Sequence, residues 1–249
     1  MICWYLFLTK EYEMSSPALN EKIWNKITDV TTSDTMTIEG TVNKSGILIL
    51  LTMAGAFAGW NSQSSGVLIL SLIVSFVLSL VIIFKPHTAT YLSQPYALIE
   101  GLLLGSISSV YAARYPGIVS NTLFATVGCF VLMLFLYRTK IIRVTEQFRT
   151  VMIVATGAIV LTYVVNMVMG FFGSNLPMIH EASPVGIAFS VIVTGVAAFN
   201  LMLDFDMIEQ AHARQAPKYM EWYCGFALLV TLVWLYMEML RLMSKLSKK

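Results

Sequence analysis

Charged side chains are scarce in this sequence. Only 12% of its 249 residues are Asp, Glu, Lys or Arg, whereas 57% are hydrophobic. An average soluble domain carries about 25% charged residues. The composition therefore excludes a soluble globular enzyme, a disordered chain and a nucleic-acid-binding protein. It predicts an all-α polytopic membrane protein whose first partner is the lipid bilayer.

Residues that catalysis or a cofactor would need are also missing from the apolar part of the sequence. The three histidines, His87, His180 and His212, fall in connections between apolar segments, so a histidine base of an intramembrane protease is not expected. An HExxH motif, a P-loop and a dinucleotide fingerprint are absent. No lysine lies between Lys218 and Lys245, which excludes a retinal Schiff base there. We expect a protein that is not an enzyme and that takes no cofactor other than Ca²⁺ as a bound or transported ion.

Long apolar segments fill the sequence after Lys44. Each approaches or exceeds the roughly 20 residues that a helix needs to cross a bilayer. Short connections, most of them with proline or glycine, separate the segments. The segments lack the apolar–polar alternation of membrane strands. We therefore predict seven transmembrane helices at 45–61, 65–84, 92–113, 118–137, 150–172, 185–208 and 219–243.

The first 43 residues differ from the rest, because they are polar and hold six of the 14 acidic residues. We treat 1–43 as a polar cytoplasmic segment and 44–249 as the seven-helix transmembrane domain. Residues 1–13 are apolar at their start but lack the basic leader and cleavage site of a signal peptide. We expect them to be an extension upstream of a more ordinary start at Met14, or to lie at the membrane interface.

The positions of Lys and Arg predict the orientation. With the N-terminus inside, 11 basic residues lie on the inner side and 5 on the outer side. The positive-inside rule therefore favours a cytoplasmic N-terminus. The basic C-terminal tail, KLSKK, would then lie outside, so either this tail is an exception or one segment is re-entrant.

Carboxylates within the predicted helices are few, and each costs about 2.5–3.5 kcal/mol if it is placed at the bilayer centre. Glu100, Asp204 and Glu221 fall within two or three helical turns of the predicted cytoplasmic face. Two neighbouring carboxylates titrate as a unit and sense pH, and their oxygens suit Ca²⁺. We predict Asp204 and Glu221 as candidate Ca²⁺ ligands, and Asp204 with Glu221 or Glu100 as a candidate pH sensor. The alternative is that such groups lie at helix ends in water.

Two more polar residues accompany Asp204 on the same predicted helix. Asn200 is four residues earlier and shares its face. Asp206 points about 200° away from Asp204 around the helix. We include both in the candidate ion path.

Glu238 lies in the last predicted helix, about 25 Å beyond Glu221 along the helix axis. This depth places it toward the outer face. Arg241 at i+3 and Arg114 are its candidate ion partners.

Small residues recur at GxxxG spacing in two predicted helices. The pairs are Gly55 with Gly59 and Gly101 with Gly105. This spacing predicts close helix packing rather than a ligand-binding loop.

The segment FNLMLDFDMIEQ (199–210) and the final LYMEML (235–240) resemble the Bax inhibitor, or YccA-like, family of seven-span proteins, also known by the transmembrane Bax inhibitor motif. IEGTVNKSGILILL, ALIEGLLLGSIS and YPGIVSNTLFATVG resemble one bacterial branch of that family. The resemblance runs from about Ser16 to the C-terminus.

The resemblance implies a fold with the last helix at its centre, in a bacterial inner membrane. It also implies a pH-sensitive Ca²⁺ leak gated by two acidic residues, which match Asp204 and Glu238 here. Because its depth puts Glu238 nearer the outer face, Glu221 or Glu100 is the alternative partner of Asp204.

Two other functions stay open. Parts of the family resemble regulators that bind a membrane AAA protease or another membrane protein, and residues 1–43 would then be the contact. A proton-coupled transporter is the third alternative, although the segments show no evident inverted repeat.

Overall fold

The computed structural model describes residues 35–62, 64–173, 176 and 181–248. Within these residues the chain is helical apart from short connections and one isolated bridge between Thr35 and Pro217. The all-α prediction is therefore confirmed. The predictions for residues 1–34, including the upstream extension, lie outside the described residues.

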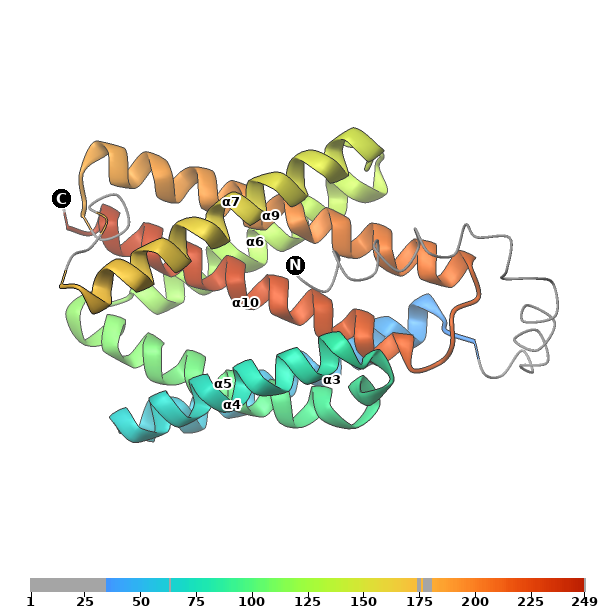
Figure 1. The fold of residues 1–249 in the computed structure, drawn as a ribbon, viewed down its shortest axis with the longest axis horizontal. Coiled ribbons are helices and arrows are strands. Elements are labelled where there is room, and N and C mark those ends of the chain that lie inside the picture. Colours follow the sequence, from blue (N-terminus) through green and yellow to red (C-terminus); the bar gives the residue numbers. More distant parts are fainter. Residues whose placement is uncertain (1–34, 63, 174–175, 177–180, 249) are drawn as a thin grey trace. The chain divides into compact units, whose positions relative to one another are not determined.

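Seven helices of the described chain are long and apolar enough to cross a membrane, which is the predicted number. Short connections join them (Figure 1). Their bounds are α3 Ile38–Ser62, α4 Ser65–Phe84, α5 Ala89–Arg114 (preceded by the 3₁₀ turn η2, Pro86–Thr88), α6 Ile118–Arg138, α7 Glu146–Phe171, α9 Pro184–Ala213 and α10 Met220–Leu246.

Helix ends differ from the predicted ends by a few residues. Helix α3 begins at Ile38 instead of 45, because the Thr37 hydroxyl caps it by accepting a hydrogen bond of 3.0 Å from the Gly40 amide. Residues 38–43 of the predicted polar segment therefore belong to the first helix. Helix α9 continues to Ala213 and α10 to Leu246. Apolar composition marks the part of a helix that suits lipid, whereas capping decides where the helix ends.

The chain divides into two compact units. Unit 1 comprises Met1–Ser106 and Met207–Leu229, and unit 2 comprises Ile107–Asp206 and Val230–Lys249. Helices α5, α9 and α10 contribute residues to both.

Glycines bring α3 and α5 together in unit 1. A methyl group added at Gly55 or Gly59 would collide with backbone atoms of α5, and one added at Gly101 or Gly105 would collide with backbone atoms of α3. Only hydrogen fits between backbones at this separation. The predicted close packing of the two GxxxG pairs is confirmed.

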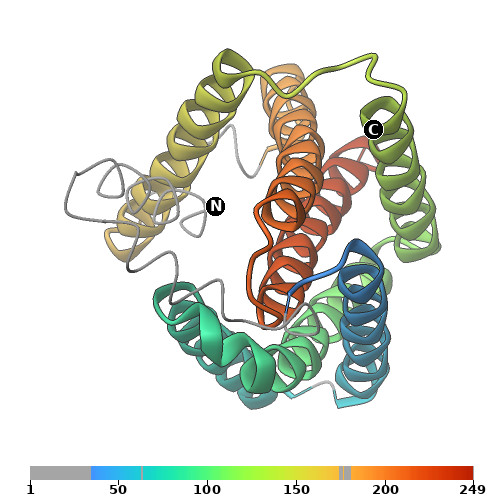
Figure 2. The same ribbon diagram turned by 90° about the vertical axis from the view of Figure 1, so that its right-hand side faces the viewer.

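The segment that leads into α3 is held to the turn between α9 and α10, also in unit 1 (Figures 1 and 2). The Met36 amide donates to the Ala216 carbonyl at 2.8 Å, and its own carbonyl lies 3.1 Å from Nδ1 of His212. The start of the first membrane helix is therefore fixed to the connection between the last two.

Aromatic contacts pack α6 and α7 onto α9 in unit 2. The rings of Phe130 and Tyr137 each lie 5.7 Å from that of Phe205, and Phe148 lies 6.0 Å from Phe199. Burial differs greatly among the spans: 56% of the most apolar stretch of α10 is buried, against 11% for α7.

Candidate functional site

Glu221, in the first turn of α10, is the most enclosed carboxylate among the described residues of unit 1. Its side chain is 1% exposed and forms ion pairs with Lys44 and, at 2.8 Å, with Lys218. The amide and hydroxyl of Thr37 also donate to it, at 2.8 and 3.1 Å. A methyl group at Gly40 would overlap the same carboxylate unless the Glu221 side chain moved, so the carboxylate lies directly against the backbone of α3.

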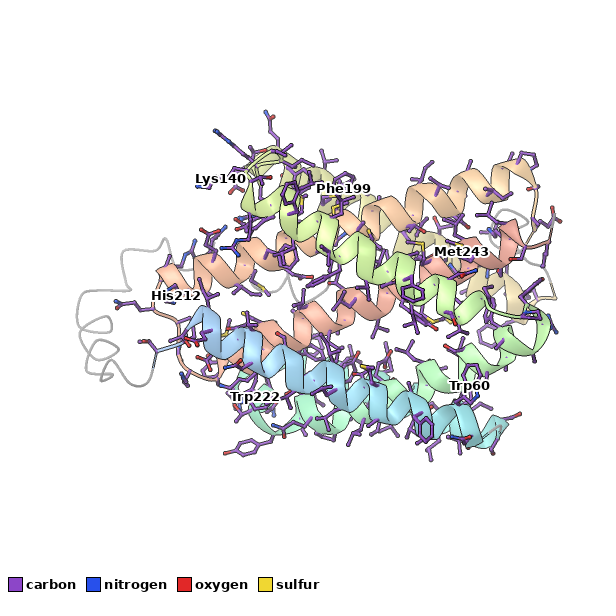
Figure 3. All side chains as sticks on the ribbon, turned by 180° about the vertical axis from the view of Figure 1, so that it is seen from behind. Trp60, Lys140, Phe199, His212, Trp222 and Met243 are labelled. Atoms are coloured by element: carbon purple, nitrogen blue, oxygen red, sulfur yellow. The ribbon has the colours of Figure 1, made fainter. Side chains whose placement is uncertain are left out.

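These contacts explain why a carboxylate can be buried at this helix end. Two ammonium groups balance its charge, and the Thr37 donors satisfy its remaining lone pairs. The Lys44 ammonium also lies 5.3 Å from the centre of the Trp222 ring. Figure 3 shows Trp222 and His212 on either side of the turn between α9 and α10. The alternative of a water-exposed Glu221 does not hold, because the side chain joins α10 to the start of α3.

Glu100 is the other buried carboxylate in the part of unit 1 that the structure describes. It lies in the middle of α5, is 9% exposed and receives a hydrogen bond from Ser75 of α4. Asp204 belongs to unit 2, so the pairing of Asp204 with Glu100 or Glu221 stays a prediction.

Asp204 of α9 is 7% exposed. The hydroxyl of Thr231 on α10 donates to its carboxylate. Its other oxygen, Oδ2, is buried without a hydrogen-bond partner among the described residues. A buried carboxylate oxygen without a donor is unfavourable unless a cation, a proton or water satisfies it.

Three buried hydroxyls of unit 2 also lack a partner within the described residues: Ser190 and Thr194 of α9 and Thr122 of α6. Ser190 and Thr194 lie 14 and 10 residues before Asp204. At about 100° per residue, Ser190 lies about 40° and Thr194 about 80° around α9 from Asp204, so the three share one side of the helix. This side carries oxygen atoms between residues 190 and 204 of an otherwise apolar sequence.

Asn200 and Asp206 both contact α7. The Asn200 amide donates at 3.1 Å to the Thr156 hydroxyl, and Asp206 forms an ion pair of 2.8 Å with Arg149. Asp204 is instead bonded from α10, so the prediction that Asp204 and Asp206 point in different directions agrees with their partners. Asn200 and Asp204 bond to different helices although they are four residues apart.

Glu238 of α10 is 2% exposed and is paired with Arg241 at 3.0 Å, as its i+3 spacing predicts. Tyr163 of α7 completes this cluster. Its hydroxyl donates to Glu238 Oε1 at 2.8 Å and accepts a hydrogen bond from the Arg241 guanidinium. The guanidinium lies 4.9 Å from the centre of the Tyr163 ring. Sequence reasoning missed Tyr163.

Three polar side chains on one face of α7 form a polar seam that helps to attach the helix to α9 and α10. Arg149, Thr156 and Tyr163 are spaced seven residues apart, so they repeat on one face every two turns, about 10.5 Å. Each makes one of the contacts described above, the first two with α9 and the third with α10. Because so little of α7 is buried, these polar contacts are a large part of what holds it.

Lys245, near the end of α10, is 2% exposed, and its ammonium donates to the Gly186 carbonyl at 2.9 Å. It is therefore part of the helix packing of unit 2 rather than a free charge of the tail. This finding removes one of the five basic residues that the orientation argument counted as outer.

No group of three or more His, Cys, Asp or Glu residues in the described part of the chain could hold a metal ion. The Glu221 carboxylate is already engaged by two lysines. The geometry does not favour Glu221 as a Ca²⁺ ligand, and the predicted role of Asp204 depends on its unpartnered oxygen.

A family model described as "Bax inhibitor 1 like" matches residues 16–248. This match covers nearly the whole chain and includes every candidate site residue. A search of the curated proteins finds no match.

Proposed function

Because this chain belongs to the Bax inhibitor 1 like family, we propose that it is a membrane protein through which Ca²⁺ or a similar cation leaks in a pH-dependent manner. Its seven apolar helices are those of an integral membrane protein. The proposed ion path is in unit 2, and Asp204 is the group that a passing cation meets.

The observation that carries this proposal is the Oδ2 atom of Asp204. It is a buried carboxylate oxygen without a protein donor among the described residues. The other three acidic side chains of the unit's helices differ, since Glu146 and Asp206 are paired with Arg149 and Glu238 with Arg241. Asp204 is therefore the carboxylate best able to attract a cation.

The surroundings of Asp204 suit a cation that passes through rather than one that stays bound. Ca²⁺ in a permanent site takes six to eight oxygen ligands, and conduction requires binding weak enough for the ion to leave. Ser190 and Thr194 lie about 21 and 15 Å from Asp204 along the axis of α9, so they cannot bind the same ion, and water would complete the shell of a cation at the carboxylate. Protonation of Asp204 would remove the attraction, which is the proposed source of the pH dependence.

The test uses the full chain in liposomes loaded with Ca²⁺, with release followed by a fluorescent indicator at several pH values. We expect wild-type release to exceed that of protein-free liposomes and to vary with pH. Asp204→Asn keeps the side-chain volume but removes the charge, so release should fall at least tenfold and lose its pH dependence.

Glu209→Gln is the matched control, because it removes an exposed carboxylate from the same helix. It should leave release unchanged. Release and pH dependence that persist in Asp204→Asn would contradict the proposal. The regulator of a membrane AAA protease would then be favoured if a membrane partner co-purifies with the full chain and is lost on deletion of residues 1–34.

A further inference from the structure

The connection between α6 and α7 carries exposed cations at the membrane surface. It runs from residue 139 to 145, between two helices that are each long and apolar enough to span. Arg138, Lys140 and Arg143 are exposed, and Figure 3 shows the side chains around Lys140 projecting away from the ribbon. The end of α6 and the loop, which together we call the α6–α7 loop (residues 138–145), therefore present three positive charges where a bilayer has its headgroups.

These three charges are not balanced by neighbouring carboxylates. The nearest acidic residue along the chain, Glu146, pairs with Arg149 at 3.3 Å, and Arg149 also pairs with Asp206. Among the residues that the structure describes, no ion pair involves Arg138, Lys140 or Arg143. The side chains are thus available to an external anion.

An apolar side chain lies within the same loop. Ile141 is 65% exposed and stands between Lys140 and Arg143. An exposed isoleucine flanked by cations is unfavourable in water but suits the boundary between headgroups and acyl chains. The combination favours a lipid surface over a soluble anion such as free phosphate, which would use the cations alone.

Lys140 occupies a backbone conformation that favours glycine. Its φ of 54° lies in the left-handed region, where α6 ends. Lysine at this position accepts strain that glycine would avoid. Replacement of Lys140 by glycine therefore removes the charge without adding strain.

We propose that the α6–α7 loop binds the headgroups of anionic phospholipids, with Arg138, Lys140 and Arg143 at the phosphates and Ile141 at the acyl boundary. Clusters of basic residues next to a transmembrane helix attract anionic lipid in this way. The proposal does not depend on cation conduction.

The other surface cations form a matched comparison. Lys85 precedes η2, Arg114 ends α5 and Lys248 follows α10, and all three are exposed. They lie in three different connections or ends, so none forms part of a cluster with Ile141. Their removal changes the net charge by the same amount as removal of the loop cations.

The experiment is native mass spectrometry of the full chain released from detergent after titration with phosphatidylglycerol or phosphatidylcholine. We expect the wild-type chain to retain phosphatidylglycerol in preference to phosphatidylcholine. In the loop variant Arg138→Gln/Lys140→Gly/Arg143→Gln, the ratio of bound phosphatidylglycerol to bound phosphatidylcholine should fall about tenfold. The control variant Lys85→Gln/Arg114→Gln/Lys248→Gln should keep it.

A fourth variant, Arg138→Lys/Lys140→Arg/Arg143→Lys, preserves charge and should retain the preference. Helical content and monodispersity are checked for every variant. The proposal is overturned if the loop variant binds phosphatidylglycerol as well as the wild type, if both triple-neutral variants lose the preference equally, or if inorganic phosphate at millimolar concentration competes as well as the lipid does.

Discussion

At the scale of single residues, buried carboxylates of this protein differ in their partners. Glu221 and Glu238 are each held by cations and by a hydroxyl group, whereas Oδ2 of Asp204 has no donor among the described residues. A carboxylate removed from water costs several kcal/mol unless charge and hydrogen bonds replace the water. The first two residues therefore act as links between helices, and we assign ion attraction to the third.

Glu221→Gln tests the structural role of the first link. We expect it to lower the free energy of unfolding by about 3 kcal/mol, since removal of one partner from a buried pair costs about 3–5 kcal/mol. The measurement is the thermal unfolding of the full chain in detergent, followed by circular dichroism. Lys218→Gln is the control, because its side chain is 49% exposed and Lys44 still neutralises Glu221. It should cost less than about 1 kcal/mol, and equal effects of the two variants would argue against the link.

At the scale of elements, α7 depends on its polar seam more than on apolar burial. The buried residues of α7 are Arg149, Met152, Thr156 and Ile159. Two of these four are polar, and Tyr163 extends the same face. A helix held in this way can separate from its neighbours at a smaller cost than one held by a continuous apolar face. We therefore expect α7 to be the most mobile membrane helix of unit 2.

Tyr163→Phe tests this expectation, because it removes one hydroxyl and keeps the ring over Arg241. A hydrogen bond to a charged group is worth about 1.5–3 kcal/mol, so amides in the second half of α7 should exchange with deuterium at least several-fold faster. The measurement is hydrogen exchange with mass spectrometry in lipid. Thr162→Val is the control, since the hydroxyl of the half-buried Thr162 donates to the Ala158 carbonyl within α7. Unchanged exchange in Tyr163→Phe would show that the seam does not hold the helix.

Sequence reasoning predicted local features of these elements and missed contacts between distant ones. The seven helices follow from stretches of about 20 apolar residues, and the Glu238–Arg241 pair from their i+3 spacing. Tyr163 is 75 residues from Glu238, and a tyrosine in an apolar helix gives no signal of its partner. Lys44 is likewise 177 residues from Glu221. Lys218 lies three residues before Glu221, and this i+3 spacing was a sequence signal that the charge of Glu221 would be neutralised.

At the scale of the whole molecule, the few charged residues fall into groups that differ in burial and in partners. Two ion pairs join helices, Lys44–Glu221 between α3 and α10 and Arg149–Asp206 between α7 and α9, whereas Glu238 pairs with Arg241 within α10. A second group, the exposed Arg138, Lys140 and Arg143, has no ion pair within the described residues, and we assign it to the anionic lipid surface. The orientation of the N-terminus stays a prediction. The count of basic residues favours a cytoplasmic N-terminus more strongly when Lys245 is left out of the outer group. Lys245 is packed against Gly186 and is not a free charge of the tail.

The most direct test of the central claim is infrared difference spectroscopy of the full chain in lipid, recorded with and without Ca²⁺. Coordination of a cation shifts the stretching bands of a carboxylate. If Asp204 meets the passing ion, Ca²⁺ should shift a carboxylate band in the wild type and in Glu209→Gln, and the shift should vanish in Asp204→Asn. A spectrum that Ca²⁺ leaves unchanged, or a shift that survives in Asp204→Asn, would contradict the account.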